Sequence, residues 1–94
     1  MTSIRERDIE RRLVDRVKEL GGEVRKVKWI GRRGAPDRLV MIKLKRKAKT
    51  IWVELKAPGE KAKPHQIREH LRMIAMGQTV VVIDSFDGIE ELFK

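Results

Sequence analysis

The stretch IWVELK, residues 51–56, has the alternating pattern of a β-strand and carries both an acid and a base. Since successive side chains of a strand point to opposite faces, one face of this strand is apolar and the other is polar. The apolar face comprises Ile51, Val53 and Leu55. The polar face carries Trp52, Glu54 and Lys56, with the carboxylate and the ammonium attached roughly 7 Å apart along the strand. The apolar face therefore predicts packing against a core, and the opposite face is a candidate site.

The residues around this strand predict a single α/β domain spanning 1–94, with a mixed central sheet flanked by helices in the order α-β-β-β-α-β. Ser3 and Glu6 fit a capping box at the start of the first helix. The basic stretch KLKRKAKT, residues 43–50, predicts a long hairpin connection between two strands. The expected strands cover 23–29, 37–44, 50–56 and 79–83, the second helix covers 64–76, and a short last helix begins with a capping box formed by Asp87 and Glu90.

The strongly positive charge of the chain indicates which classes of partner it can bind. It has 94 residues, with 23 Lys and Arg against 14 Asp and Glu, a formal net charge of +9 and an isoelectric point near 10.4. Such an excess of positive charge is typical of nucleic-acid binding, although a solubility surface or a ribosome-type structural role has the same composition. The absence of cysteine excludes disulfides and thiolate zinc sites, and no apolar run predicts a membrane span.

Two further acids stand in positions where apolar side chains are expected. Asp37 opens the strand 37–44, and pairing of this strand with 50–56 brings it near Glu54. Glu10 falls on the apolar arc of the first helix, where a carboxylate is costly unless something compensates it. Glu6 lies near the same arc, but the capping box explains it.

Carboxylates that converge beside a lysine suit a hard divalent cation and hydrolysis of a phosphate ester. Mg²⁺ prefers oxygen ligands and is commonly held by one or two carboxylates together with substrate phosphate. A neighbouring lysine can orient the attacking water and offset developing negative charge. The alternative is a structural ion pair between Glu54 and Lys56 on an exposed strand face, which explains the same spacing.

The combination of GAPDRLV, WVELK and PHQ at the start of a helix resembles the VRR-NUC domain of the PD-(D/E)XK nuclease superfamily. This resemblance covers nearly the whole chain and implies a restriction-endonuclease-like fold and Mg²⁺- or Mn²⁺-dependent cleavage of DNA. It implies that Asp37, Glu54 and the Leu55 backbone carbonyl bind the metal. It further implies that Lys56 acts on the attacking water, that Glu10 assists the metal through water, and that Gln66 completes the site.

Stand-alone members of that family resemble virus-encoded or bacterial homodimers that act on branched DNA. The resemblance thus implies a homodimer similar to Holliday-junction resolvases, in the cytoplasm of a bacterial or virus-infected host cell. A non-catalytic basic nucleic-acid-binding module is the alternative, and it predicts binding without cleavage. Basic residues of three loops are the candidate DNA contacts, against the alternative of solvated loops: Arg32, Arg33, Lys45, Arg46, Lys47, Lys61 and Lys63.

Five other residues have ordinary structural explanations. We expect Trp52 to pack against a helix, and His65 and His70 to be structural and not metal ligands. The main apolar stripe of the helix at 64–76 comprises Ile67, Leu71 and Ile74. Met73 and Met76 lie on another side of this helix, as gap fillers or as part of a contact with a partner helix.

Overall fold

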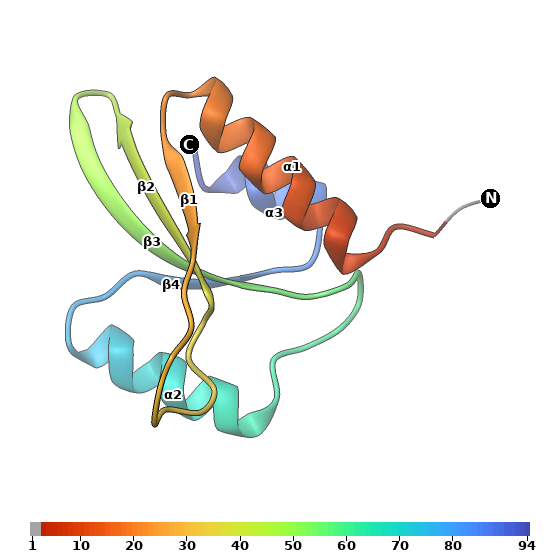
Figure 1. The fold of residues 1–94 in the computed structure, drawn as a ribbon, viewed down its shortest axis with the longest axis vertical. Coiled ribbons are helices and arrows are strands. Elements are labelled where there is room, and N and C mark those ends of the chain that lie inside the picture. Colours follow the sequence, from red (N-terminus) through yellow and green to blue (C-terminus); the bar gives the residue numbers. More distant parts are fainter. Residues whose placement is uncertain (1–2) are drawn as a thin grey trace.

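A four-stranded mixed sheet organises the computed structural model, which describes residues 3–94 (Figure 1). The strand order is β1-β2-β3-β4, with antiparallel β1–β2 and β2–β3 pairs and a parallel β3–β4 pair. The elements are α1 (Glu6–Glu19), β1 (Glu23–Lys26), β2 (Arg38–Leu44), β3 (Lys47–Leu55), α2 (Pro64–Ala75), β4 (Val80–Ile83) and α3 (Phe86–Glu91). This arrangement confirms the predicted α/β class and element order.

Helices cover both faces of the sheet, and the two faces differ in character. Helices α1 and α3 lie together on one face and α2 lies on the other (Figure 1). The apolar core fills the first layer and includes the three apolar side chains of the IWVELK strand. The layer under α2 instead contains the buried Glu69 and His70, with Met73 as the buried apolar residue of the helix. Within residues 3–94, no helix has the length and apolar character required to cross a membrane.

The first helix begins later than its predicted capping box. Its N-cap is Arg5, whose backbone N–H donates to the Asp8 carboxylate at 2.8 Å. Ser3 therefore lies outside the cap, and the capping explanation for Glu6 is wrong. The cause is that Asp8, three residues after Arg5, satisfies the free backbone donor at the actual helix start. Glu6 is then an acid of the first turn without a capping role.

The last helix also begins differently from the prediction. Its N-cap is Ser85, whose hydroxyl accepts a hydrogen bond from the Gly88 backbone N–H at 3.0 Å. Asp87 consequently lies inside the first turn and does not cap the helix. Glu90 is free of a capping role and turns toward α1.

The β2–β3 hairpin is tighter than the long connection predicted from its basic sequence. Leu44 pairs with Lys47, so only Lys45 and Arg46 form the turn. Both turn residues have positive φ, 49° and 69°, which is the backbone of a type I′ turn and matches the twist of the flanking strands. The strand β3 therefore extends back to Lys47, three residues earlier than expected.

The second helix buries a different side from the one its apolar stripe suggests. The side chains of Ile67, Leu71 and Ile74 are exposed to solvent, and Leu71 retains 60% of its accessible surface. Met73 is buried, while Met76 is exposed. The helix instead turns polar residues toward the sheet because the strand face beneath it carries charged residues, which need polar partners.

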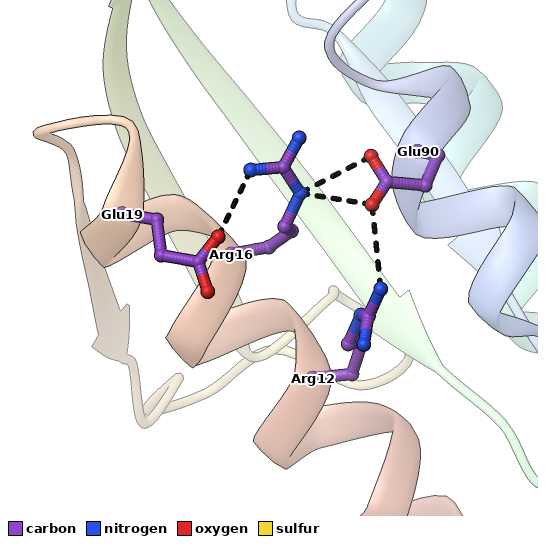
Figure 2. A network of polar contacts seen from close by, with 4 residues as sticks. All are labelled: Arg12, Arg16, Glu19 and Glu90. Atoms are coloured by element: carbon purple, nitrogen blue, oxygen red, sulfur yellow. Dashed lines mark hydrogen bonds and ion pairs between the residues drawn. The ribbon is translucent and has the colours of Figure 1, made fainter.

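A network of charged side chains joins α1 and α3 on the core side of the sheet (Figure 2). The Glu90 carboxylate accepts a hydrogen bond from Arg16 Nε at 2.8 Å and lies 3.7 Å from an Arg12 nitrogen. Arg16 also contacts Glu19, and its guanidinium lies over the Phe93 ring. The hydrogen bond from Arg16 is the main cause that lowers the pKa of Glu90. The network thus stabilises the docking of α3 on α1.

Replacing Glu90 with glutamine is expected to lower Tm at pH 7 by about 2–4 °C, the range of partly exposed ion pairs in a small domain. Because the pKa of Glu90 is lowered by folding, its contribution is complete above the ordinary value of 4.5 and is lost as the pH falls through the folded pKa. Thermal melts of both proteins between pH 3 and pH 7 should therefore converge at the acid end. Glu91→Gln is the matched control, since the Glu91 carboxylate is exposed and its ion pair among the described residues is with Lys94 and not with α1. A gap between wild type and Glu90→Gln that stays constant to pH 3 would contradict this role.

Candidate active site

The register of the central hairpin brings two carboxylates to directly opposite positions. Arg38 pairs with Val53 and Leu39 with Trp52. One step further along this register, Asp37 stands opposite Glu54. Directly opposite residues of an antiparallel pair point to the same face, so both carboxylates belong to the α2 face of the sheet. The Asp37 backbone carbonyl accepts a hydrogen bond from the Val27 N–H at 2.9 Å, which ties this end of β2 to the end of β1.

Glu54 lies in an environment that disfavours its charge. Its side chain retains only 12% of its accessible surface, whereas Asp37 retains 48%. Burial raises the pKa of Glu54 from 4.5 to about 7, with Lys56 opposing this shift and the charge of Asp37 adding to it. A buried carboxylate beside a second carboxylate is typical of a site that gains from a bound cation.

Lys56 and Leu55 continue from Glu54 at the end of β3. The Lys56 backbone N–H donates to the Ile83 carbonyl at 2.9 Å, and its side chain is largely buried. Among residues 3–94 the Lys56 ammonium makes no ion pair, so its charge is available to a ligand. Leu55 lies beyond the last β2–β3 pair, and its side chain is buried in the core. The alternative of a Glu54–Lys56 ion pair is therefore not formed, although Lys56 does stabilise the charged form of Glu54.

The buried Arg38 supplies the compensation that Glu10 needs. Its guanidinium hydrogen-bonds to the Glu10 carboxylate and forms an ion pair with Asp37 at 2.9 Å. Arg38 faces the α1 layer because it alternates with Val40 and Ile42, which are both buried. The sequence contains a signal for this pair, since Glu10 and Arg38 are opposite charges on two elements whose neighbouring positions are apolar. Local sequence patterns alone assign no role to Arg38.

The charge of Glu6 affects Glu54, which the sequence does not suggest. The charge of Glu6 is one of the causes that raise the pKa of Glu54, whereas Glu10 is not among them. Glu10 is instead occupied by Arg38. Glu6, an exposed acid of the first turn of α1, is thus near enough to Glu54 for its charge to act on that carboxylate.

The donor set fits a cation held by few protein ligands. Within residues 3–94, no three His, Asp or Glu side chains form a group that could hold a metal ion, so Glu10 does not join Asp37 and Glu54 in one cluster. Asp37 and Glu54 remain as carboxylate ligands, and the Leu55 backbone carbonyl implied by the family resemblance follows Glu54 in the chain. Mg²⁺ commonly takes this few protein ligands when waters and substrate phosphate complete its coordination shell.

Two residues of α2 complete the surroundings of Glu54. His70 is buried, and its Nε2 lies 3.7 Å from Glu54 Oε1 without a hydrogen-bond partner among the described residues. Burial lowers the pKa of His70, so a neutral imidazole faces the acid. Gln66 uses its side-chain oxygen to accept a hydrogen bond from the Lys63 N–H at 2.8 Å, which caps the helix. Because the Gln66 oxygen is used in this cap, the amide NH₂ group is the part of the side chain that can fill the predicted site role.

Trp52, which shares the face of Glu54, packs as an apolar side chain. Its ring lies 5.2 Å from the ring of Trp29, centroid to centroid, and both line a hollow with Met73 and Met76 of α2. The indole N–H donates to the Gln78 side chain at 3.2 Å. This arrangement fits the expected packing against a helix.

The predicted DNA contacts fall into separate regions. Arg32 lines a groove together with Asp37, so it lies near the candidate site. Lys61 and Lys63 precede α2 and are exposed. Lys45, Arg46 and Lys47 occupy the hairpin tip, roughly 25 Å from Asp37 along an extended strand. The hairpin tip and the acids are thus not gathered into one pocket.

Comparisons with known proteins place this geometry in context. A scan against protein-family models finds no match. The chain is 51% identical over 87 residues to "Putative nuclease p44" of Acyrthosiphon pisum secondary endosymbiont phage 1, which covers 93% of this chain and 90% of the relative. A solved structure described as a VRR_NUC domain superposes with a TM-score of 0.81 at 36% identity, covering 96% of this chain and 95% of the other.

Proposed function

Because the chain belongs to the VRR-NUC nuclease family, we propose that it is a Mg²⁺- or Mn²⁺-dependent DNA endonuclease that cuts branched DNA as a homodimer. The observation that carries this proposal is the hairpin register, which sets Asp37 opposite Glu54 when continued by one residue, together with the largely buried Lys56 two residues further along the chain. The phage origin of the 51% identical relative supports action in the cytoplasm of a bacterial or virus-infected host cell.

The residues of the site divide into cation ligands and groups that act on water. Asp37, Glu54 and the Leu55 carbonyl would hold the cation. When bound, a divalent cation polarises the phosphate and lowers the pKa of water. The Lys56 ammonium donates hydrogen bonds that orient the attacking water and offset negative charge on the phosphoryl oxygens. Water would add to phosphorus and give up a proton to solvent, while the bond from phosphorus to the leaving sugar oxygen breaks and that oxygen takes up a proton from solvent.

Glu10 and Gln66 have supporting places in this proposal. Glu10 holds Arg38, and Arg38 holds the Asp37 carboxylate, so Glu10 influences the site through an arginine. This route runs through Arg38, whereas the family resemblance implies that Glu10 acts on the metal through water. Gln66 is anchored at the start of α2, with its NH₂ group free to donate to a phosphate or to water.

An exposed apolar surface supports the homodimer. Ile67, Leu71 and Ile74 of α2 recur at helical spacing on one side, and Ile67 shares a hollow with Val82 of the edge strand β4. Monomeric domains seldom leave such a stripe in water, and symmetric association of two copies would bury it. Two active sites related by a two-fold axis suit symmetrical incision of a DNA junction.

The rival function is a basic module that binds nucleic acid without cutting it. To decide between the two, purified protein is incubated with labelled four-way junctions, flaps, nicked duplexes and linear duplexes, with Mg²⁺, Mn²⁺ or EDTA. We expect metal-dependent cleavage with a preference for branched substrates. Salt-sensitive binding of every substrate without any cleavage would favour the rival.

A further inference from the structure

A hollow lined by arginines lies between the loop before β2 and the outer part of α2. Its volume is about 300 Å³, and its charged lining comprises Arg32, Arg33, Arg68, Glu69 and Arg72, with Gly31 and His65 beside them. The loop supplies two of the arginines and the helix supplies the other two. None of the acids of the candidate active site lines this hollow. It is therefore a separate feature of the α2 face.

A buried carboxylate organises two of the arginines. The Glu69 side chain retains 4% of its accessible surface and accepts hydrogen bonds from Arg32 Nε at 2.9 Å and from Arg72 at 2.7 and 3.0 Å. These hydrogen bonds, that of Arg32 first, lower the pKa of Glu69, so the carboxylate is ionised at neutral pH. Both guanidinium groups are thus held in place while several of their N–H groups remain free of Glu69.

The other two arginines have no protein partner. Among residues 3–94, the side chains of Arg33 and Arg68 make no hydrogen bond and no ion pair, and both are exposed. Four guanidinium groups against one carboxylate leave three positive charges without compensation around one hollow. Solvation alone explains a dispersed set of arginines, but it does not explain a buried acid that fixes two of them beside two free ones. Planar guanidinium donors converging on a hollow are suited to the oxygens of a phosphate.

The loop that carries Arg32 and Arg33 is fixed against the helix. Gly34 has φ of +83°, and a Cβ atom added there would lie 2.8 Å from the His65 backbone oxygen. Only glycine allows this close approach of the loop to the first turn of α2. The hollow is therefore preorganised, and less conformational entropy is lost when a ligand binds.

The position of Arg32 connects the hollow to the candidate active site. Arg32 lines the arginine hollow and also the groove that contains Asp37, Lys26 and Lys28. A DNA strand whose scissile phosphate lies at Asp37 can therefore continue past Arg32 to the hollow. Resting on the proposed function for its substrate, we propose that the arginine hollow binds a second backbone phosphate of the DNA, away from the phosphate that is cut.

Binding without cleavage tests this proposal. Wild type, the double variant Arg33→Gln/Arg68→Gln and the control Lys18→Gln are titrated against a fluorescein-labelled duplex in EDTA, over a series of KCl concentrations. The control removes a positive charge from the exposed end of α1, on the opposite face of the sheet. We expect the double variant to bind about tenfold more weakly and its log–log salt slope to fall by about 1, as when one phosphate contact is lost. The control should stay within about twofold of wild type.

The outcomes separate this proposal from the proposed function. Equal affinity and equal salt slope in wild type and the double variant would contradict phosphate binding in the arginine hollow, whether or not the protein cuts DNA. A loss of affinity in Lys18→Gln as large as in the double variant would overturn it as well, since a general charge effect would then suffice. Absence of cleavage by wild type in Mg²⁺ and Mn²⁺ would remove the nuclease function but leave the binding result intact. Unchanged thermal melts establish that the variants are folded.

Discussion

Asp37→Asn is expected to lower DNA cleavage in Mg²⁺ or Mn²⁺ by at least about 10³-fold while the protein still binds DNA. The substitution keeps the shape of the side chain and removes one of the two carboxylates that face each other across the hairpin. Binding should persist because the basic residues that contact phosphate are unchanged, and the loss of a negative charge near the DNA does not weaken it. The measurement pairs a cleavage time course with a binding titration in EDTA.

The fold is expected to survive this substitution. Arg38 loses an ionic partner at Asp37, but its guanidinium keeps the hydrogen bond to Glu10. Asp15→Asn is the matched control, because Asp15 is exposed on α1 and makes no ion pair among the described residues. Cleavage at the wild-type rate by Asp37→Asn, with the control equally active, would exclude Asp37 as a ligand and with it the proposed mechanism.

Glu54→Gln is expected to inactivate the enzyme and to stabilise the metal-free protein above pH 7. The folded protein holds the Glu54 proton up to a pKa of about 7, whereas an unfolded chain releases it near the ordinary value of 4.5. The free energy of unfolding of wild type therefore falls as the pH rises from about 4.5 to about 7, by on the order of 2–3 kcal/mol. Glutamine carries no charge, so the free energy of unfolding of the variant does not fall in this way as the pH rises.

Thermal melts in EDTA at pH 5 and pH 8 measure this effect. Glu54→Gln should melt well above wild type at pH 8 and near it at pH 5, where Glu54 is protonated in the folded state. Addition of Mn²⁺ at pH 8 should raise the Tm of wild type and leave that of Glu54→Gln nearly unchanged. Glu60→Gln serves as the control, since Glu60 is exposed in the loop before α2. A lower Tm of Glu54→Gln than of wild type at pH 8 would show that the charged form of Glu54 is stabilising, contrary to this account.

Several elements of the fold follow from local pattern. The alternation in IWVELK correctly separates the core face from the face with Trp52 and Glu54, because strand geometry fixes which neighbours share a side. The start of α2 at Pro64 and its stop before Gly77 also follow from the chain itself, as proline suits the first turn and glycine suits positive φ. These features depend on residues a few positions apart.

The misplaced features depend on contacts between distant segments. The stripe of Ile67, Leu71 and Ile74 has the spacing of a buried face, yet it is exposed because the strand face under α2 is charged. The explanation of Glu10 required Arg38, a residue 28 positions away, which no helical pattern includes. The capping box at Ser3 matched a motif that the chain contains but does not use.

The amino-acid sequence alone predicted the class of the fold, the face of β3 that carries Glu54, and the family to which the chain is similar. It did so because side-chain period, turn residues and motif spacing are properties of short segments. The three-dimensional fold was needed to show that Asp37 stands opposite Glu54, that Glu10 is paired with Arg38, and that four arginines line one hollow with Glu69. Those facts rest on strand register and on the pairing of buried charges across layers, where the free energy of a contact depends on residues that the local pattern leaves unspecified.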